Sequence, residues 1–215
     1  MRTGIFSVAA LLAALYVSEL LTLGALEPGY SHMRQFASEL GMATAAHPRL
    51  FSVWVLIQAV MFLMAGLLLY RRVAELTRRR GISIAIGLFV ACMGINYIFV
   101  AVFPLPDLRH SGFGIAFLTL LVPWLLAWAF WNTPRARNAC YWQMVATPVL
   151  ILLVFLQPGV VDFVDATNMG LFQRIGAGTF YIWLILTGLW LDRLSANAPV
   201  LVRSAFSDTL LGEES

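Results

Sequence analysis

The chain has 215 residues, of which 60% are hydrophobic and 12% are charged, and its formal net charge is +3. Soluble domains carry about 25% charged residues, so a water-soluble fold of this length could not bury so much apolar surface. The small net charge argues against a nucleic-acid partner, and two cysteines are too few for a disulfide framework. The composition therefore indicates a membrane protein, with lipids as its surrounding partners.

Six stretches of the chain are apolar and long enough to cross a bilayer as helices, which takes about 20 residues. In chain order they are residues 5–26, 50–70, 82–104, 113–132, 141–157 and 172–192. The first is too long for a signal peptide and is interrupted by Glu19, and Pro148 favours a kink in the fifth. Strand-like alternation is absent. We predict an all-α integral membrane protein, a six-helix bundle forming one domain over residues 1–193, with a cytoplasmic tail over 194–215.

The arginines predict which way the chain crosses the membrane. The two ends of the chain and two of the connections carry ten arginines, whereas the other three connections carry Arg34, Arg49, Arg109 and Arg174. Under the positive-inside rule the arginine-rich side faces the cytoplasm. We therefore expect both termini to be cytoplasmic, in the cytoplasmic (inner) membrane of a prokaryote.

The three connections on the outer side are richer in polar residues than the others. Residues 27–49 have room for a short amphipathic helix from about Ser31, which could cap it, to Gly41, which could end it. Residues 103–112 contain two prolines, which disfavour helix, together with Asp107, Arg109 and His110. Residues 157–174 contain Asp162 and Asp165 and end at Arg174. These connections are the predicted location of a functional site.

Three polar residues lie inside the predicted spans at similar depth. Glu19 is seven residues from the outer end of its span, and Gln58 and Asn96 are each eight residues from theirs. At about 1.5 Å per residue, all three lie roughly 10–12 Å below the outer surface. A carboxylate facing lipid is costly, so we expect Glu19 to face the interior and to share one cavity with Gln58 and Asn96. For the two amides, simple cross-linking of helices is an equal or better explanation.

Short motifs give the chain a resemblance to a known family. They are SELG from Ser38 to Gly41, the FPxxDxxH run from Phe103 to His110, and Gln173 with Arg174 at the start of the last span. Together they resemble the six-span prokaryotic membrane proteins catalogued as domain of unknown function nine-nine-eight, over roughly residues 5–193. The resemblance implies the six-span fold but no reaction. It also marks a set of positions, which are Ser38, Glu39, Gly41, Pro104, Asp107, His110 and Arg174.

Familiar catalytic and cofactor motifs are not found. No zinc-type spacing of His and Cys occurs, although His47, Asp107 and His110 could form a composite site, and no histidine lies within a span to bind haem. A nucleophile elbow is missing, so a triad of Ser38, His110 and Asp107 would be arbitrary. We predict neither a metal nor a cofactor, and the sequence leaves open whether the protein is an enzyme.

The outer arginines have two readings. Arg34, Arg109 and Arg174 could converge on an anionic headgroup through paired hydrogen bonds. Alternatively, they form ion pairs that hold the loops together, with Glu39, Asp107, Asp162 and Asp165 as partners. In either case we predict that Glu39, Asp107, His110 and Arg174 form one polar cluster beneath the segment 31–41.

The leading functional hypothesis is an outward-facing polar pocket that binds an amphiphile, such as a lipid or isoprenoid headgroup, and that could also modify it. A second hypothesis is an accessory or assembly subunit with a membrane-protein partner. A third is a small transporter, against which the lack of a detectable inverted repeat argues.

Overall fold

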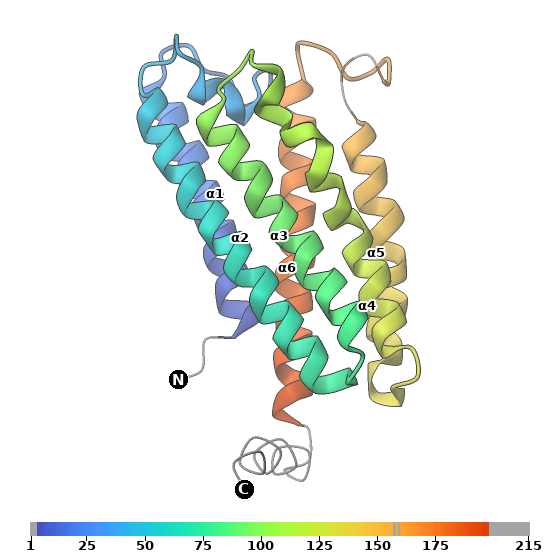
Figure 1. Ribbon diagram of the computed structural model, residues 1–215. Coiled ribbons are helices and arrows are strands. Elements are labelled where there is room, and N and C mark those ends of the chain that lie inside the picture. Colours follow the sequence, from blue (N-terminus) through green and yellow to red (C-terminus); the bar gives the residue numbers. More distant parts are fainter. Residues whose placement is uncertain (1–3, 157, 159, 198–215) are drawn as a thin grey trace, which may run out of the picture.

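The structure is a computed structural model that describes residues 4–156, 158 and 160–197. Six helical segments are long enough to cross a membrane, and they run side by side as a bundle (Figure 1). The α-helices are α1 Ile5–Leu26, α2 Pro48–Thr77, α3 Arg80–Val102, α4 Val122–Phe130, α5 Arg137–Phe155 and α6 Met169–Ala196, and three 3₁₀ segments are η1 Ala37–Gly41, η2 Leu108–Leu121 and η3 Pro134–Ala136. The described residues contain no strand. All six spans are long and apolar enough to cross a membrane, so this is a multi-pass, all-α membrane protein as predicted.

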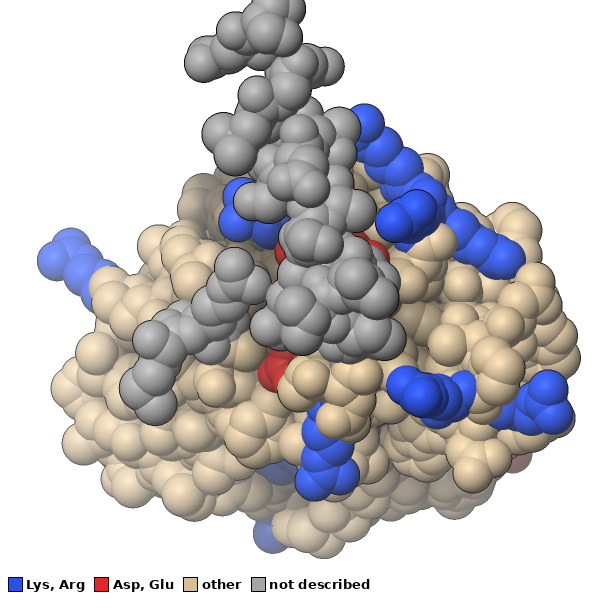
Figure 2. Space-filling view, turned by 90° about the horizontal axis from the view of Figure 1, so that it is seen from below, with Lys and Arg blue, Asp and Glu red and all other residues tan. Residues whose placement is uncertain are grey.

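The two ends of the bundle differ in their connections (Figure 1). One end holds the α1–α2, α3–η2 and α5–α6 connections, and we call it the loop end. The other holds the start of α1, the α2–α3 and α4–α5 connections and the end of α6, and we call it the arginine-rich end. Seen from below, arginine side chains are spread over that end (Figure 2). Most of the predicted tail, residues 198–215, lies outside the described residues.

Two helices extend beyond the apolar stretches that predicted them. The second span was expected to end at residue 70, but α2 continues to Thr77, and α6 continues past residue 192 to Ala196. These extensions are polar, so hydropathy could not reveal them, yet they pair with each other. Arg72, in the extension of α2, donates a hydrogen bond to the Ser195 hydroxyl, in the extension of α6. Arg72 also lies 3.5 Å from Asp192, the last residue of the predicted sixth span, and Asp192 accepts a hydrogen bond of 3.0 Å from the backbone N–H of Phe6. This carboxylate thus caps the first turn of α1, where the helix dipole favours negative charge.

The fourth span is less regular than predicted. It begins as the 3₁₀ segment η2 and becomes α-helical only at α4, where Pro123 occupies the first turn. Gly112, Phe113 and Gly114 have φ of +56°, +55° and +76°. Glycine adopts this left-handed conformation without steric cost, so the two glycines permit the kink. The predicted start at residue 113 therefore fell on the kink and not on the beginning of a helix.

The loop between α1 and α2, which we call the first outer loop after the side that the sequence predicts for it, also differs from its predicted structure. The expected helix from Ser31 to Gly41 is only the five-residue segment η1, Ala37–Gly41, and its cap is Phe36. Ser31 instead begins a turn, because its carbonyl accepts hydrogen bonds from the N–H groups of Arg34 and Gln35. The predicted end at Gly41 is correct. Leu40 packs on Leu23, Phe51 and Val55, so the loop covers the ends of α1 and α2.

Small residues allow α2 and α3 to approach closely. A Cβ atom added to Gly66 would lie 2.6 Å from the carbonyl oxygen of Gly87, which is too close for any larger residue. Such contacts between glycines are typical of helix packing in membranes, where lipid tails leave little hydrophobic drive between helices. Buried aromatic residues, including Phe62, Phe130 and Trp183, fill the interior of the bundle.

Candidate functional site

A buried carboxyl group lies in the interior of the loop half of the bundle. Glu19 on α1 is 3% exposed, and Gln58 on α2 is fully buried beside it. The Gln58 amide nitrogen donates a hydrogen bond to Glu19 Oε2. Arg72 and Arg109 form the ion pairs found among the described residues, and none of these pairs involves Glu19. The acid therefore faces the interior, as predicted, with an amide rather than a cation as its partner.

Two tyrosines extend this contact to α3 and α6. Tyr181 on α6 donates a hydrogen bond of 3.3 Å to Gln58 Oε1, and the hydroxyl groups of Tyr97 on α3 and Tyr181 lie 3.1 Å apart. Since Tyr181 uses its proton on Gln58, Tyr97 is the donor in the second bond. Four helices thus contribute one side chain each. We call Glu19, Gln58, Tyr97 and Tyr181 the Glu19 network.

Aromatic rings and one unpartnered hydroxyl surround the network. The rings of Tyr16 and Tyr181 are 5.1 Å apart, and the Phe62 ring is 5.1 Å from that of Tyr97. The Tyr16 hydroxyl is buried and has no hydrogen-bond partner within the described part of the chain. A buried polar atom without a partner costs roughly 1–3 kcal/mol. The site therefore has an unused donor and acceptor next to a carboxyl group.

The structure separates Asn96 from this network. Its side-chain oxygen is buried against Gly112, at the kink of the fourth span, and has no hydrogen-bond partner among the residues described. Its neighbour Tyr97 occupies the place in the network that depth alone predicted for Asn96. Successive helical residues differ in direction by about 100°, so equal depth does not bring two side chains together.

Arg174 fastens the first outer loop to α6. Its guanidinium donates to the carbonyl oxygens of Gln35 at 2.9 Å and Gly170 at 2.6 Å, and to the Tyr30 hydroxyl at 2.5 Å. The side chain of the preceding residue, Gln173, accepts a hydrogen bond of 2.8 Å from the Ala37 N–H. Both residues of the predicted pair thus hold the loop. Arg174 Nε is buried without a partner among the described residues.

The electrostatics of the loop follow from this buried cation. Burial raises the pKa of the Tyr30 hydroxyl, and the charge of Arg174 partly opposes that shift. Burial, followed by the positive charge of Arg174, lowers the pKa of His32. Both effects favour the neutral form of the His32 imidazole.

The remaining predicted residues of the first loop have local roles. Glu39 accepts hydrogen bonds from the Phe36 N–H at 2.8 Å and the Gln35 amide at 3.2 Å, which stabilises the start of η1. Arg34 is exposed, and Ser38 is half-buried. No side-chain hydrogen bond of either residue is found in the described part of the chain.

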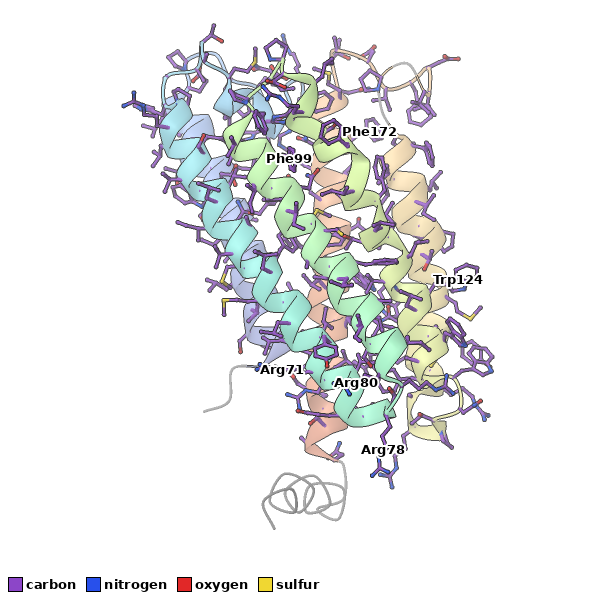
Figure 3. The ribbon with its side chains drawn as sticks, viewed as in Figure 1. Arg71, Arg78, Arg80, Phe99, Trp124 and Phe172 are labelled. Carbon is purple, nitrogen blue, oxygen red and sulfur yellow. The ribbon has the colours of Figure 1, made fainter. Side chains whose placement is uncertain are left out.

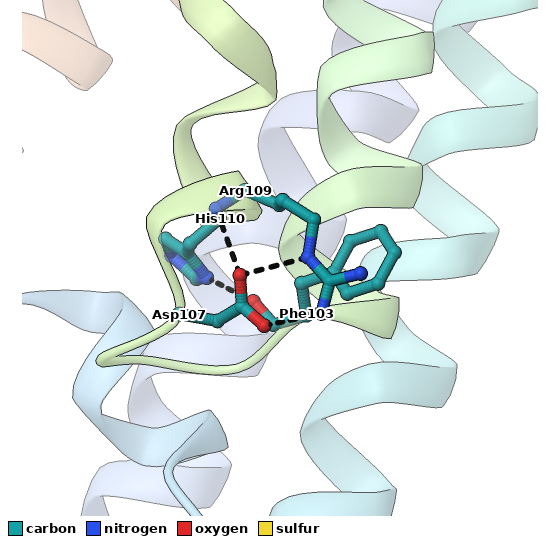
Figure 4. A network of polar contacts seen from close by, with 4 residues as sticks. All are labelled: Phe103, Asp107, Arg109 and His110. Atoms are coloured by element: carbon teal, nitrogen blue, oxygen red, sulfur yellow. Dashed lines mark hydrogen bonds and ion pairs between the residues drawn. The ribbon is translucent and has the colours of Figure 1, made fainter.

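Asp107, Arg109 and His110 form a separate cluster at the start of η2 (Figure 4). Asp107 accepts hydrogen bonds from the Arg109 N–H at 2.8 Å and from its guanidinium at 3.0 and 2.7 Å. These bonds lower the pKa of Asp107 to about 2. The Arg109 guanidinium also lies 3.9 Å from the Phe103 ring centroid, and His110 Nδ1 is 2.8 Å from the Phe103 carbonyl oxygen. The cluster thus anchors this loop to the end of α3.

The predicted single cluster is therefore divided in two. His110 contacts Phe103, and Arg174 contacts Tyr30, Gln35 and Gly170, so the two share no hydrogen-bond partner among the described residues. Of the proposed arginine–acid pairs, only Arg109 with Asp107 forms there. Asp165 instead binds Thr167 in its own turn, and Asp162 is exposed. The composite site of His47, Asp107 and His110 is likewise not assembled among these residues.

One buried polar group escaped the sequence analysis. Gln143 on α5 is fully buried, donates to Thr187 Oγ1 at 2.9 Å and accepts from the Trp183 ring N–H at 2.7 Å. In the predicted fifth span, 141–157, Gln143 is only two residues from the start, at the depth of a membrane interface, whereas α5 begins six residues before it, at Arg137. Both of its partners lie on α6, and the nitrogen and the oxygen of its amide each have a partner there, as expected of a helix cross-link.

The sequence matches the model of the family described as "Protein of unknown function (DUF998)" over residues 7–190. This chain belongs to that family. No curated protein and no solved structure matches it. The match covers all six spans of this family member, both loop clusters and the Glu19 network, and it confirms the resemblance carried by the motifs of Ser38–Gly41, Phe103–His110 and Gln173–Arg174.

Proposed function

We propose that this protein binds an amphiphile whose polar headgroup reaches the Glu19 network inside the loop half of the bundle. The observation that carries the proposal is Glu19 itself, a buried acid in a membrane span whose hydrogen bond comes from a neutral amide. Ionisable groups within spans are costly and usually serve a function. A purely structural contact between α1 and α2 needs no acid, as Gln143 and Thr187 demonstrate between α5 and α6.

The hydrogen-bonding groups of the site indicate the class of ligand. Glu19 accepts hydrogen bonds, the Tyr16 hydroxyl has no partner among the residues that the structure describes, and aromatic rings line the surroundings. A headgroup bearing hydroxyl or amino groups fits this set, because it donates to Glu19 while its apolar chain remains in lipid. A cationic amine would in addition interact favourably with the tyrosine rings. This chemistry covers lipid and isoprenoid headgroups and assigns no catalytic step.

The first outer loop controls access in this proposal. The loop covers the ends of α1 and α2, and Arg174 and Gln173 fasten it to α6. Insertion of a headgroup from the loop end therefore requires the loop to lift. We place Arg174 as the clamp that holds the loop closed, and we assign the predicted ligand contact to Glu19 instead.

The orientation belongs to the same proposal. Ten of the chain's arginines lie on the predicted cytoplasmic side and four on the other, a bias that supports a cytoplasmic arginine-rich end and an outward-facing loop end. The headgroup would then come from the outer leaflet of the cytoplasmic membrane.

The test is to extract the protein in mild detergent and to quantify the co-purifying lipids by mass spectrometry. We expect one headgroup class to be enriched over the membrane extract. Glu19→Gln should lower that enrichment by about tenfold or more, because hydrogen bonds to charged groups contribute about 1.5–3 kcal/mol. Glu75→Gln is the matched control, since it neutralises a half-exposed acid at the arginine-rich end.

Two results would overturn the proposal. In one, no headgroup class is enriched in the wild-type protein. In the other, Glu19→Gln and Glu75→Gln retain the same lipids as the wild type. A single protein that co-purifies in constant ratio, without lipid enrichment, would support the accessory-subunit hypothesis instead. Thermal unfolding of each variant shows whether a loss of lipid reflects a loss of fold.

A further inference from the structure

An apolar groove opens on the surface of the bundle between α2 and α3. Its volume is about 300 Å³, and its walls include Leu63, Leu67 and Tyr70 of α2 and Ile84, Leu88 and Ala91 of α3. Leu67 is 48% exposed and Leu88 is 60% exposed, so the groove faces outward. In a membrane protein this surface contacts lipid tails.

The groove exists because glycines form its floor. Gly66 and Gly87 line it and bring the two helix backbones together, and a Cβ atom added to Gly87 would meet the Tyr70 Cβ at 2.7 Å. The larger apolar side chains stand on either side of this contact. From Leu63 to Tyr70 the groove follows two turns of α2, about 10 Å. It is thus a narrow channel along the helices with room for an extended apolar chain.

Two arginines lie at the arginine-rich end of this groove. Arg71 directly follows Tyr70 and is one turn beyond Leu67, and Arg80 is one turn before Ile84 on α3. Figure 3 shows Arg71 and Arg80 at similar height near the lower ends of the two helices. Both are exposed, and neither forms an ion pair among the described residues. The nearby acid Glu75 pairs with Arg72, at 3.8 Å.

We propose that this groove binds an anionic phospholipid, with one acyl chain between α2 and α3 and the phosphate group at Arg71 and Arg80. Charge complementarity decides this occupant. Guanidinium groups bind phosphate through paired hydrogen bonds, and the groove continues from them as an apolar channel in the direction a lipid chain takes. A helix from a second copy of the chain would have to bring an acid to this end of the groove, and the exposed acid described nearby, Glu75, already pairs with Arg72. The site lies at the opposite end of the bundle from the Glu19 network and does not depend on the function proposed there.

The test measures retained lipids by native mass spectrometry of the protein released from nanodiscs of phosphatidylglycerol and phosphatidylethanolamine. We expect the wild type to retain phosphatidylglycerol preferentially. The double variant Arg71→Gln with Arg80→Gln should reduce that preference by about 30-fold, which corresponds to about 1 kcal/mol for each arginine. The matched control is Arg78→Gln with Arg135→Gln, which removes the same charge from the same end of the molecule and should leave the preference nearly unchanged.

A second pair of variants tests the groove itself. Leu67→Trp fills it, whereas Leu11→Trp adds the same bulk at a similarly exposed position on α1. Phosphatidylglycerol retention should fall in Leu67→Trp and persist in Leu11→Trp. If both arginine pairs act equally, the effect is general surface charge, and the site is refuted. If Leu67→Trp retains the lipid, the acyl chain does not occupy the groove. A wild-type dimer that Leu67→Trp dissociates would show that a second copy fills it.

Discussion

Gln58 donates a hydrogen bond to Glu19 while it accepts one from Tyr181, so the orientation of its amide is fixed from both sides. The tyrosine proton selects the amide oxygen, and the amide nitrogen is left to face the acid. This arrangement joins α1, α2 and α6 through one side chain. It holds the buried acid in place and leaves the carboxyl group without a charged partner among the described residues.

Replacing Gln58 by leucine should destabilise the protein by about 1–3 kcal/mol, because Glu19 and the Tyr181 hydroxyl both lose a buried partner. Removing the acid as well should recover part of that loss. The double variant Glu19→Leu with Gln58→Leu is therefore expected to be more stable than the sum of the single changes predicts. Unfolding in detergent measures all three variants. Strict additivity would show that the two side chains do not interact.

The Asp107 carboxylate should respond to pH far below neutrality. Its pKa is lowered to about 2 from an ordinary value of 3.8, chiefly by its hydrogen bonds with Arg109. A lowered pKa means that the ion pair stabilises the loop above about pH 4 and loses that effect as the pH falls towards 2. The carboxyl carbon signal of Asp107, assigned by comparison with Asp107→Asn, should titrate below pH 3. In the variant Arg109→Gln the midpoint should rise towards the ordinary value, and an unchanged midpoint would contradict the assigned cause.

Removing the Arg174 side chain should release the first outer loop. Arg174→Ala deletes the two hydrogen bonds that join the loop to α6, those to Gln35 and Tyr30, so amide hydrogen exchange at Phe36 and Ala37 should accelerate by about tenfold or more. Arg174→Lys keeps the charge but cannot reproduce the forked contacts, and we expect it to exchange nearly as fast. Arg34→Ala is the control, because Arg34 is exposed in the same loop. Equal amide protection in Arg174→Ala and Arg34→Ala would show that Arg174 does not hold the loop closed.

The orientation is tested by fusing a reporter that is active only outside the cytoplasm. We expect activity after Ala45, in the first outer loop, and none after Arg79, between α2 and α3. The reason is the arginine bias, since arginine-rich connections are retained on the cytoplasmic side. The opposite pattern would show that the molecule has the opposite orientation, with the Glu19 network in the cytoplasmic half of the membrane.

The sequence predicted the fold well because hydropathy alone sets the number and position of spans. All six were found, and the first was predicted with the bounds of α1. The 3₁₀ geometry of the fourth span was missed, since it depends on the kink at Gly112 and Gly114 and not on composition. The polar extensions of α2 and α6 were missed because hydropathy detects only the part of a helix that is in contact with lipid.

The site was predicted only in part, because sequence gives depth but not direction. Glu19 and Gln58 lie at the same depth, point toward each other and are joined by a hydrogen bond. Asn96 lies at that depth but faces the fourth span. Tyr97 and Tyr181 carried no distinguishing signal, because a tyrosine inside a span can pack as an aromatic side chain whether or not its hydroxyl joins a polar network. Arg174 was correctly placed beneath the first loop, but its partners are backbone carbonyls, which no residue pattern reveals.

Gly112 offers a test of the kink. Its φ of +56° disfavours any residue with a side chain, and an added Cβ would lie 2.6 Å from the Asn96 side-chain oxygen. Gly112→Ala should therefore lower the stability by about 1–3 kcal/mol. Gly81→Ala is the control, because an added Cβ there meets nothing within 4 Å and alanine favours helix.

The two contributions at Gly112 can be separated. Asn96→Ala removes the side chain that the new Cβ would meet and also an oxygen without a partner among the described residues, so alone it should cost little stability. Combined with Gly112→Ala, it should restore the steric part of the loss and leave the backbone part, because the left-handed φ remains. Unfolding in detergent gives each term by difference. If Gly112→Ala is as stable as the wild type, the fourth span does not hold the left-handed kink within η2 on which this account of Asn96 depends.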